Sequence, residues 1–249
     1  MPERGAQSAR SMLGAHVLKV GCCGFAGRQS DYFQTFRLVE IQQTFYEPPR
    51  VETARRWRAM APPDFEFTLK AWQLITHTPE SPTYRRLRMP LGPEQRRQCG
   101  HFQDSPIVHT AWVRTVEVAR ALQATRIIFQ CPARFTPTVD HVRQLQRFFR
   151  SVDRAGLDLV WEPRGMWPTD LVRDLCVELG LTHAVDPFRG PCLAGEVPYY
   201  RLHGIGGYAH RFRDEELDEL KGRVGRGPAY VLFNNVSMKE DALRFLNRL

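Results

Sequence analysis

Short runs of β-branched and aromatic residues recur along the chain and alternate with stretches that have the hydrophobic period of a helix. The runs rich in Val, Ile, Leu, Phe or Tyr predict strands at 17–22, 37–42, 65–70, 126–130, 157–162, 181–186, 198–203 and 229–234. Apolar stripes with the helical period predict helices at 51–60, 107–122, 138–155, 168–179, 214–222 and 237–249. Residue types that commonly cap helices support these ends: Thr138 and Ser237 at N-termini, and Gly156, Gly180 and Gly222 at C-termini.

Eight strands that alternate with helices predict a parallel sheet covered by helices on both faces. In a chain of 249 residues, the natural closed form of eight such repeats is a (β/α)8 TIM barrel, an α/β fold. We expect a single barrel domain over residues 16–249, preceded by a flexible polar tail over 1–15. The segment 187–197, between the sixth and seventh strands, is too short for a full helix.

A long insertion, residues 77–106, follows the third predicted strand. Long loops in compact domains are usually functional or disordered, and this one carries more arginines than carboxylates. It is either a solvated arm or a lid that contacts an anion, and the pattern leaves both open. Its arginines are Arg85, Arg86, Arg88, Arg96 and Arg97.

Polar residues stand at the C-terminal ends of most of the predicted strands. In a TIM barrel these ends and the loops after them meet at one face and supply the reactive groups. The strands of a closed barrel are covered on both sides, so a charge at these ends must find a partner. The candidates at strand ends are Glu40, Gln42, Lys70, Gln130, Glu162, Asp186, His203 and Asn234. Tyr46 and His77, in the loops after the second and third strands, are further candidates for substrate binding, as are the amides of Gln42, Gln130 and Asn234.

Lys70 ends the alternating run FEFTLK. We expect it to point into the barrel mouth among Glu40, Glu162 and Asp186, where it would transfer protons or polarise a carbonyl group. A Schiff-base role is open as well, but it requires a lowered pKa. The structural alternative is a lysine whose stem packs on Trp72 while its ammonium group reaches water.

The segment VWEPRGMWP (160–168) holds a second group of candidates. Glu162 and Arg164 share one strand face because they are two residues apart. Glu162 is a candidate general base or acid, and Arg164 a bidentate clamp for a carboxylate or phosphate. Alternatively the two form an ion pair with each other or with Lys70.

The segment YYRLHGIGGY (199–208) holds a third group. Arg201 and His203 share a face; His203 can exchange protons near neutral pH, although a strand-end histidine is often structural. The glycines that follow free the backbone to turn its N–H groups toward an anion, as barrels often do with phosphate after their seventh and eighth strands. The anion-binding candidates here are Arg201, Gly204, Gly206 and Gly207, with Asn234 and Asn235 from the eighth strand exit.

A metal site is the sharper alternative. Four candidates are ligand types that suit magnesium, manganese or zinc: Glu40, Glu162, Asp186 and His203. Lys70 and Arg164 count against a metal, because both cations would compete for the same carboxylates. We therefore predict no bound cofactor and keep a divalent metal as an alternative. Phosphate-binding fingerprints of nucleotide enzymes are missing from the sequence: there is no P-loop, and GIGG does not open the helix of a dinucleotide unit.

Charge and cysteine content bound the partners and the compartment. The net charge of +8 and the pI of about 9.5 favour anionic partners, either a small anionic substrate or nucleic acid, without choosing between them. The six cysteines are scattered without a framework, which predicts free thiols in a reducing cytoplasm. No run approaches the ~18 apolar residues of a membrane span, and the polar start lacks the apolar core of a signal peptide. We predict a cytoplasmic protein with no membrane partner.

Eight ordered motifs show that the sequence resembles the family called domain of unknown function 72, a set of TIM-barrel proteins. They are GCCGF (21–25), VEIQQTFYEPP (39–49), FEFTLKAWQLITH (65–77), IIFQCPARF (127–135), VWEPRGMWP (160–168), AVDPF (184–188), YYRLHG (199–204) and LFNN (232–235). The resemblance spans about 17–236 and is closest to the branch with QQTFY and KAWQLITH. It implies the barrel and the importance of the strand-end residues, and it brings no established reaction. Cys23, Phe25 and Gln42 replace the Ser, Trp and Asn of the more widespread form.

Three functions follow from these residues. The first is an enzyme that uses acid–base chemistry, without a redox cofactor, on a small anionic or polyhydroxylated substrate: a lyase, isomerase or hydrolase. The second is a metal-dependent phosphodiesterase or nuclease acting on nucleic acid. The third is a non-catalytic barrel that keeps its mouth as a ligand pocket. We favour the first.

Overall fold

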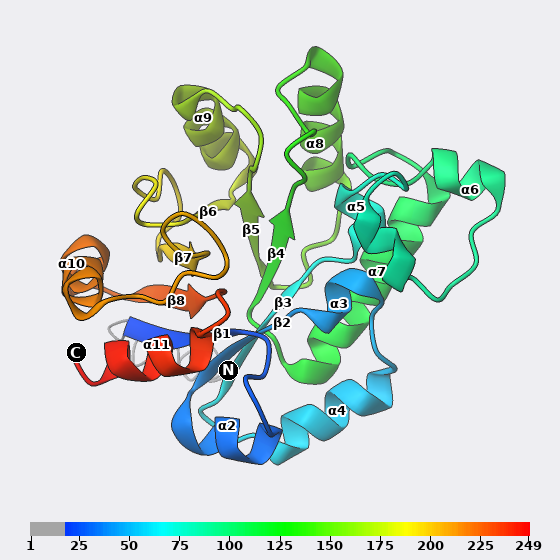
Figure 1. The fold of residues 1–249 in the computed structure, drawn as a ribbon. Helices are drawn as coiled ribbons and strands as arrows, with labels where there is room; N and C mark the ends of the chain where they lie inside the picture. Colours follow the sequence, from blue (N-terminus) through cyan, green and yellow to red (C-terminus); the bar gives the residue numbers. More distant parts are fainter. Residues whose placement is uncertain (1–17) are drawn as a thin grey trace, which may run out of the picture.

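The computed structural model describes residues 18–249 and has eight parallel strands closed into one barrel (Figure 1). Each strand pairs with the next, and β8 closes the ring against β1 from Leu18↔Ala229 to Cys22↔Phe233. The predicted TIM barrel is therefore confirmed, whereas the predicted tail, 1–15, lies outside the described residues. The strands are β1 Leu18–Cys23, β2 Leu38–Ile41, β3 Glu66–Lys70, β4 Arg126–Gln130, β5 Asp158–Glu162, β6 Thr182–Val185, β7 Tyr199–Leu202 and β8 Ala229–Phe233.

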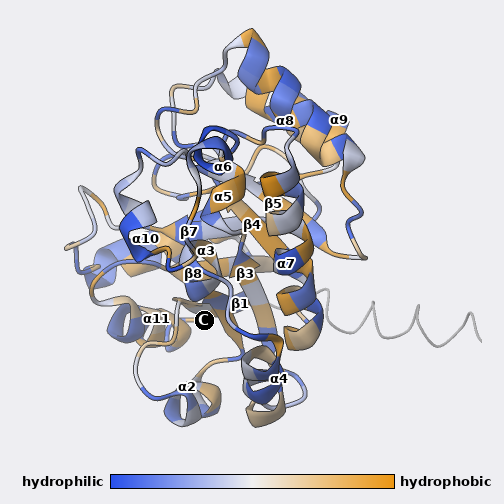
Figure 2. Ribbon diagram, turned by 90° about the vertical axis from the view of Figure 1, so that its right-hand side faces the viewer, coloured by the Kyte–Doolittle hydropathy of each residue, from blue (hydrophilic) through white to orange (hydrophobic). Residues whose placement is uncertain are grey.

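Helices surround the barrel and bury one face against it. In Figure 2 the helices α8 and α9 alternate between hydrophilic and hydrophobic stretches, as amphipathic helices do. The longer helices are α2 Gln29–Thr35, α4 Val51–Met60, α7 Pro106–Leu122, α8 Val139–Ser151, α9 Thr169–Leu179, α10 Asp214–Val224 and α11 Met238–Leu246. Short turns of helix follow the second and third strands: α3 Gln43–Tyr46, α5 Gln73–Thr76, the 3₁₀ helix η1 Pro82–Arg86, and α6 Pro93–Arg97. These four, with α2, are too short to show a helical period in the sequence.

Two of the predicted caps form as expected. The Thr138 hydroxyl accepts a hydrogen bond from the His141 N–H at 3.1 Å and begins α8. Gly180 ends α9 in the left-handed conformation, with φ of 57°, where glycine has no steric cost.

Three other predicted caps differ. Ser237 begins α11 without a capping hydrogen bond from its side chain. Helix α8 ends at Ser151, before Gly156, because the backbone is already extended at Val152, with ψ of 136°. The Asp153 carboxylate then accepts the Ala155 N–H at 2.9 Å in the turn that follows. Helix α10 continues through Gly222 and ends at Gly225.

The two predicted departures from a regular barrel have clear structures. Residues 186–198, all of them in the described part of the chain, contain no helix between β6 and β7. The insertion carries η1 and α6, and its last part is hydrogen-bonded to α5. The Tyr84 hydroxyl donates to the His77 carbonyl at 2.7 Å. The Phe102 N–H donates to the Ile75 carbonyl at 2.8 Å.

Apolar side chains fill the layer between strands and helices, whereas the interior of the barrel is partly polar. Inside the ring the Tyr199 hydroxyl lies 2.8 Å from Thr68 Oγ1 and donates to Glu40 Oε2 at 2.8 Å. All six cysteines lie in the described part of the chain and are free thiols. Among residues 18–249, no helix has the length and apolar character needed to cross a membrane.

Candidate active site at the mouth of the barrel

The parallel strands bring the predicted strand-end residues to one end of the barrel, as the fold requires. They do not face one cavity. Instead they form three neighbouring groups: a buried ion cluster, a histidine with its partners, and a lysine that lines a large cavity.

The buried ion cluster is built around Arg201 on β7. Its guanidinium is fully buried and pairs with Glu40 of β2, from Nη2 to Oε1 at 2.7 Å and from Nε to Oε2 at 3.0 Å. The Nη1 group donates to Glu162 Oε2 of β5. Two carboxylates thus share one cation across the barrel interior, and the planar fork of arginine suits this bidentate pairing.

This cluster corrects two predictions. Arg201 has no surface to offer a substrate, so it is not an anion-binding residue. Glu40 is also fully buried, and its two oxygens already accept from Arg201, Tyr199 and Gln42. Their role is structural: a buried charge is stable only when paired and hydrogen-bonded.

Glu162 joins the ion cluster to the histidine group. Its Oε1 lies 2.7 Å from Arg164 Nε and 3.1 Å from His203 Nε2. Burial raises the pKa of this carboxyl, but the guanidinium of Arg201, the His203 hydrogen bond and Arg164 together bring it well below its usual range. Glu162 therefore stays ionised at neutral pH, which corrects the general-acid half of its prediction. The general-base half stays a prediction, and the same carboxylate contacts His203.

His203 is held from three sides. Arg164 Nη2 lies 2.6 Å from its Nε2, Asn234 Nδ2 lies 3.0 Å from its Nδ1, and its backbone N–H donates to Asp186 Oδ2 at 3.0 Å. Burial lowers the pKa of this imidazole, so the ring is neutral at pH 7. It lines a side cavity of about 370 Å³ with Glu162, Arg164 and Asp186.

Asp186 differs from its prediction as a proton-transfer residue. Its other oxygen, Oδ1, accepts the Phe188 N–H at 3.0 Å, so both oxygens are used by backbone donors. The carboxylate fixes the turn after β6 and the start of the loop after β7.

Lys70 stands apart from both groups. It ends β3, is 7% exposed, and its Nζ lies 3.6 Å from the centre of the Phe45 ring. Among residues 18–249 no carboxylate lies within ion-pair distance of this Nζ, because Glu40 and Glu162 are already bound to Arg201. Burial and the nearby guanidinium of Arg201 lower the pKa of Lys70 from 10.5 to about 7.

The Phe45 ring opposes this shift without cancelling it. A cation over an aromatic face gains about 0.5–2 kcal/mol, which favours the ammonium form. Each pKa unit corresponds to about 1.4 kcal/mol, so a fall from 10.5 to about 7 outweighs the ring. A substantial fraction of the Lys70 amines is therefore neutral at physiological pH.

Lys70 lines a cavity of about 1100 Å³, which we call the mouth cavity. Five of the predicted residues share it, and all of them come from strand ends or the loops after them: Gln42, Tyr46, Lys70, Gln130 and Asn234. Residues that sequence reasoning missed also line it: Cys23, Gln43, Glu47, Arg50 and Tyr208. Only proximity in the fold identifies them as cavity residues, although all but Arg50 stand inside segments already singled out.

The insertion contributes the cationic side of the mouth cavity. Arg85, Arg86 and Arg88 line it together with Arg50, and Arg86 stacks 3.4 Å from the centre of the Tyr46 ring. Within the described part of the chain, no carboxylate forms an ion pair with any of these four side chains. The single carboxylate of the lining, Glu47, instead accepts the backbone N–H of Arg88 at 2.6 Å.

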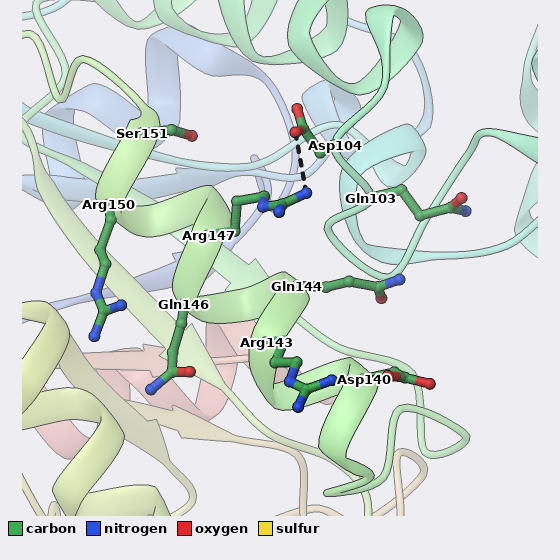
Figure 3. A pocket seen from close by; sticks show the side chains of 9 residues that line it. All are labelled: Gln103, Asp104, Asp140, Arg143, Gln144, Gln146, Arg147, Arg150 and Ser151. Carbon is green, nitrogen blue, oxygen red and sulfur yellow. Dashed lines mark hydrogen bonds and ion pairs between the residues drawn. The ribbon is translucent and has the colours of Figure 1, made fainter.

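A second arginine-rich surface has the opposite character. It is a groove of about 810 Å³ on α8 and the adjoining residues 103–104 (Figure 3). There Arg147 pairs with Asp104 at 3.3 Å and Arg150 pairs with Glu178. Guanidinium groups that are already paired have less to offer an anion than those of the mouth cavity.

Several predicted residues lie behind the cavity wall. His77 is buried with its ring 4.9 Å from that of Phe45, and burial with the neighbouring Lys70 lowers its pKa to about 3, so it supports Phe45 as a neutral ring. Asn235 is fully buried, and its Nδ2 donates to the His210 carbonyl and to Asp241, both at 2.7 Å. The structure therefore corrects the prediction that His77 and Asn235 bind substrate directly.

The glycine loop after β7, predicted to bind an anion, uses one of its backbone N–H groups internally. The Gly207 N–H donates within the loop to the Gly204 carbonyl at 3.2 Å. What the loop presents to the mouth cavity is the Tyr208 side chain. All three glycines of the loop have positive φ, and the Gly207 N–H is not free to bind an anion.

Substituting alanine at two of these glycines should separate packing from backbone strain. At Gly204, with φ of 88°, an added Cβ would lie 2.3 Å from the Gly207 carbonyl oxygen, whereas at Gly206, with φ of 83°, it meets nothing within 4 Å. Strain in this region costs about 1–3 kcal/mol. Gly204→Ala is expected to lower the free energy of unfolding by about 3 kcal/mol or more, and Gly206→Ala by about 1 kcal/mol, in urea titrations. Equal effects would contradict the close contact.

The side chains proposed as ligands of a metal do not all lie together in the structure. Among residues 18–249 no three His, Cys, Asp or Glu side chains are grouped to hold an ion. Glu40 and Glu162 direct their oxygens to guanidinium groups, and Asp186 to backbone N–H groups. The donor set proposed from sequence thus does not converge.

Comparisons with known proteins agree with the fold. The model of the family described as "Protein of unknown function DUF72" matches residues 26–249. A DUF72 family protein from Enterococcus faecalis is 18% identical with a TM-score of 0.70, covering 94% of this chain and 98% of its own. One from Thermotoga maritima is 20% identical with a TM-score of 0.62, covering 93% and 99%. A D-psicose 3-epimerase is 12% identical with a TM-score of 0.54, covering 93% and 98%. No curated protein matches the chain. At these identities the likeness shows the shared barrel fold alone.

Proposed function

This chain belongs to the DUF72 family, and from that premise we propose that it is an enzyme that acts on a small anionic substrate in the mouth cavity. The chemistry is acid–base chemistry centred on Lys70, without a redox cofactor. Hydroxyl groups of the substrate would be bound by the amides of Gln42, Gln130 and Asn234, which line the same cavity.

The observation that carries this proposal is the state of Lys70. Its amine is buried at a strand end and lacks a carboxylate partner within residues 18–249, and its pKa is lowered to about 7. A group of this pKa can accept and return a proton at neutral pH, which suits a general base. Burying an unpaired amine is unfavourable for stability, so its position at the opening of a cavity favours a functional role.

The arginines of the mouth cavity support an anionic substrate. Four guanidinium groups surround one space that contains a single carboxylate. Guanidinium groups bind carboxylates and phosphates through paired hydrogen bonds. The excess positive charge of the chain would also attract such a substrate from solution.

The two other candidate functions have less support. A metal-dependent nuclease would need the carboxylates that arginines and backbone groups already hold. A non-catalytic ligand pocket could use the same open cavity, and Glu162 does not close it because this carboxylate pairs with Arg201 and Arg164. Such a pocket would, however, leave the buried Lys70 amine without a chemical role. The free thiols are consistent with our proposal of a cytoplasmic location.

Turnover of a panel of substrates tests the proposal. We expect purified protein to convert a phosphorylated or carboxylated sugar or related acid, with nucleic acids in the same panel unchanged. Lys70→Met should lower kcat/KM at least about 100-fold, and Arg86→Ala with Arg88→Ala should raise KM at least about tenfold. Activity should rise with pH through about 7 as Lys70 loses its proton.

The exposed lysine of α10 provides the control, since Lys221→Met should leave kcat/KM unchanged. Turnover that survives Lys70→Met would overturn the assignment of Lys70. Nucleic acid cleavage that requires added metal would instead support the second candidate.

A further inference from the structure

We propose that the substrate is a phosphorylated aldehyde or ketone and that Lys70 condenses with its carbonyl carbon to form an imine. This inference rests on the proposed function and names the substrate class and the covalent step at the same site. It follows from the surroundings of the amine, from the donors next to it, and from the arginines across the cavity.

The surroundings of Lys70 leave its nitrogen available as a nucleophile. The Phe45 ring covers one side at 3.6 Å, and the nearest acidic residues, Glu40 and Glu162, are committed to Arg201. In an ion pair with a carboxylate, the Lys70 amine would stay protonated. Its nitrogen would then have no free lone pair with which to attack a carbonyl carbon. Desolvation and a neighbouring cation are the two means by which enzymes activate an amine for imine formation, and both are present here.

The residues next to Lys70 suit the carbonyl oxygen. Gln42, Gln130 and Asn234 line the same cavity and bring amide donors from three different strand ends. Such donors can hold the oxygen that becomes negatively charged when an amine adds to a carbonyl group. Asn234 also contacts His203, whose neutral ring links it to Glu162.

The covalent step balances without a further reactant. The neutral Lys70 nitrogen attacks the carbonyl carbon, the C–N bond forms, and the π electron pair moves to oxygen, which takes up a proton while the nitrogen loses one. The carbinolamine then loses water as the C=N bond forms. Hydrolysis reverses both steps and returns the amine.

The insertion arginines account for the phosphate. Arg85, Arg86 and Arg88 reach the cavity from one segment, η1 and the residue pair after it, and Arg50 reaches it from the start of α4. Their guanidinium groups lack carboxylate partners within residues 18–249, in contrast to the paired arginines of the α8 groove. A phosphate dianion can accept from two or more such groups at once.

Trapping with pyridoxal 5′-phosphate, an aldehyde that carries a phosphate, tests the inference. The folded protein is incubated with this probe and reduced with sodium borohydride, whose hydride adds to the imine carbon and leaves a secondary amine. Intact mass and peptide mapping should find one reduced adduct, at Lys70. The three other lysines differ in surroundings: Lys19 pairs with Glu66, Lys221 is exposed, and Lys239 is half-buried on α11.

Three comparisons make the result decisive. Lys70→Met should abolish the adduct while Lys221→Met leaves it unchanged, with circular dichroism confirming that both variants fold. Pyridoxal without phosphate should label Lys70 at least about tenfold more slowly, and Arg86→Ala with Arg88→Ala should remove that preference. Inorganic phosphate should protect Lys70 in the unmodified protein.

The outcomes separate this inference from the proposed function. Labelling spread evenly over the lysines, or none at Lys70, overturns the imine. If turnover of an anionic substrate still depends on Lys70, the proposed function stands and the lysine acts as a base. If labelling at Lys70 does not depend on the phosphate of the probe or on the arginine substitutions, the inference that the substrate carries a phosphate is wrong. If inorganic phosphate does not protect Lys70 from labelling and no turnover depends on Lys70, both the inference and the proposed function are wrong.

Discussion

Arg201→Met is expected to lower the free energy of unfolding by about 3–5 kcal/mol at pH 7, because removing one partner of a buried ion cluster leaves uncompensated charge. Here the loss would strand two buried carboxylates, Glu40 and Glu162, that share this guanidinium. Urea titrations followed by circular dichroism would measure the change. The matched control is Arg150→Met, which removes an exposed ion pair worth less than about 1 kcal/mol.

The free energy of unfolding of Arg201→Met should also depend on pH differently from that of the natural protein. In the natural protein the folded-state pKa of Glu162 is lowered, so this group contributes stability above its unfolded pKa of 4.5 that is lost as the pH falls. Without Arg201, only His203 and Arg164 would oppose the burial of Glu162, so the pKa of its carboxyl would rise and the variant would gain stability relative to the natural protein as the pH falls from 7 toward 5. The difference between the two proteins should therefore narrow in that range. A loss below about 1 kcal/mol that is flat with pH would contradict the central place of the cluster.

Lys70→Met is expected to have the opposite effect and to raise the free energy of unfolding, by about 2–4 kcal/mol at pH 6. The folded-state pKa of Lys70 is about 7 and its ordinary value is 10.5. Between these values the unfolded chain binds more protons than the folded one, so the natural protein gains stability as the pH rises. Methionine fills a similar volume and removes the unfavourable free energy of burying the ammonium group.

The stabilisation by Lys70→Met should thus be largest below pH 7 and shrink as the pH approaches 10.5. Thermal and urea unfolding from pH 6 to pH 10 would follow it, with Lys221→Met as the exposed control, expected to change stability by less than about 0.5 kcal/mol. Gain of stability with loss of turnover is the pattern of a residue kept for function. Destabilisation at every pH would show instead that the protein satisfies the Lys70 ammonium group.

These two residues also show how far the strand-end pattern reaches. Lys70 ends a predicted strand, and Arg201 lies two residues before the end of another. The pattern places them at one end of the barrel but does not separate their roles. Arg201 is predicted to bind an anion, but it is the buried centre of an ion cluster. Lys70 is predicted to lie among carboxylates, but its ammonium group lies against the Phe45 ring and forms no ion pair within residues 18–249.

The anion-binding side of the site shows the same limit. The sequence favoured Arg164 and Arg201 because they share strand faces with Glu162 and His203. It favoured the glycine loop after β7 because barrels often bind phosphate after their seventh and eighth strands. In the structure Arg164 pairs with Glu162, and the loop uses its Gly207 N–H internally. The arginines without carboxylate partners come from the insertion, for which the sequence left both an arm and a lid open.

The sequence by itself determined the order and type of the main elements, the closed parallel barrel, and the end of the barrel at which polar groups gather. These depend on local periodicity and on the alternation of side chains along a strand, both of which can be read from neighbouring positions. Tertiary structure alone decided which charges pair, which are buried, and which side chains share the mouth cavity. Pairing depends on distances between residues far apart in the chain, and the pKa of Lys70 depends on desolvation and on which neighbours are already neutralised.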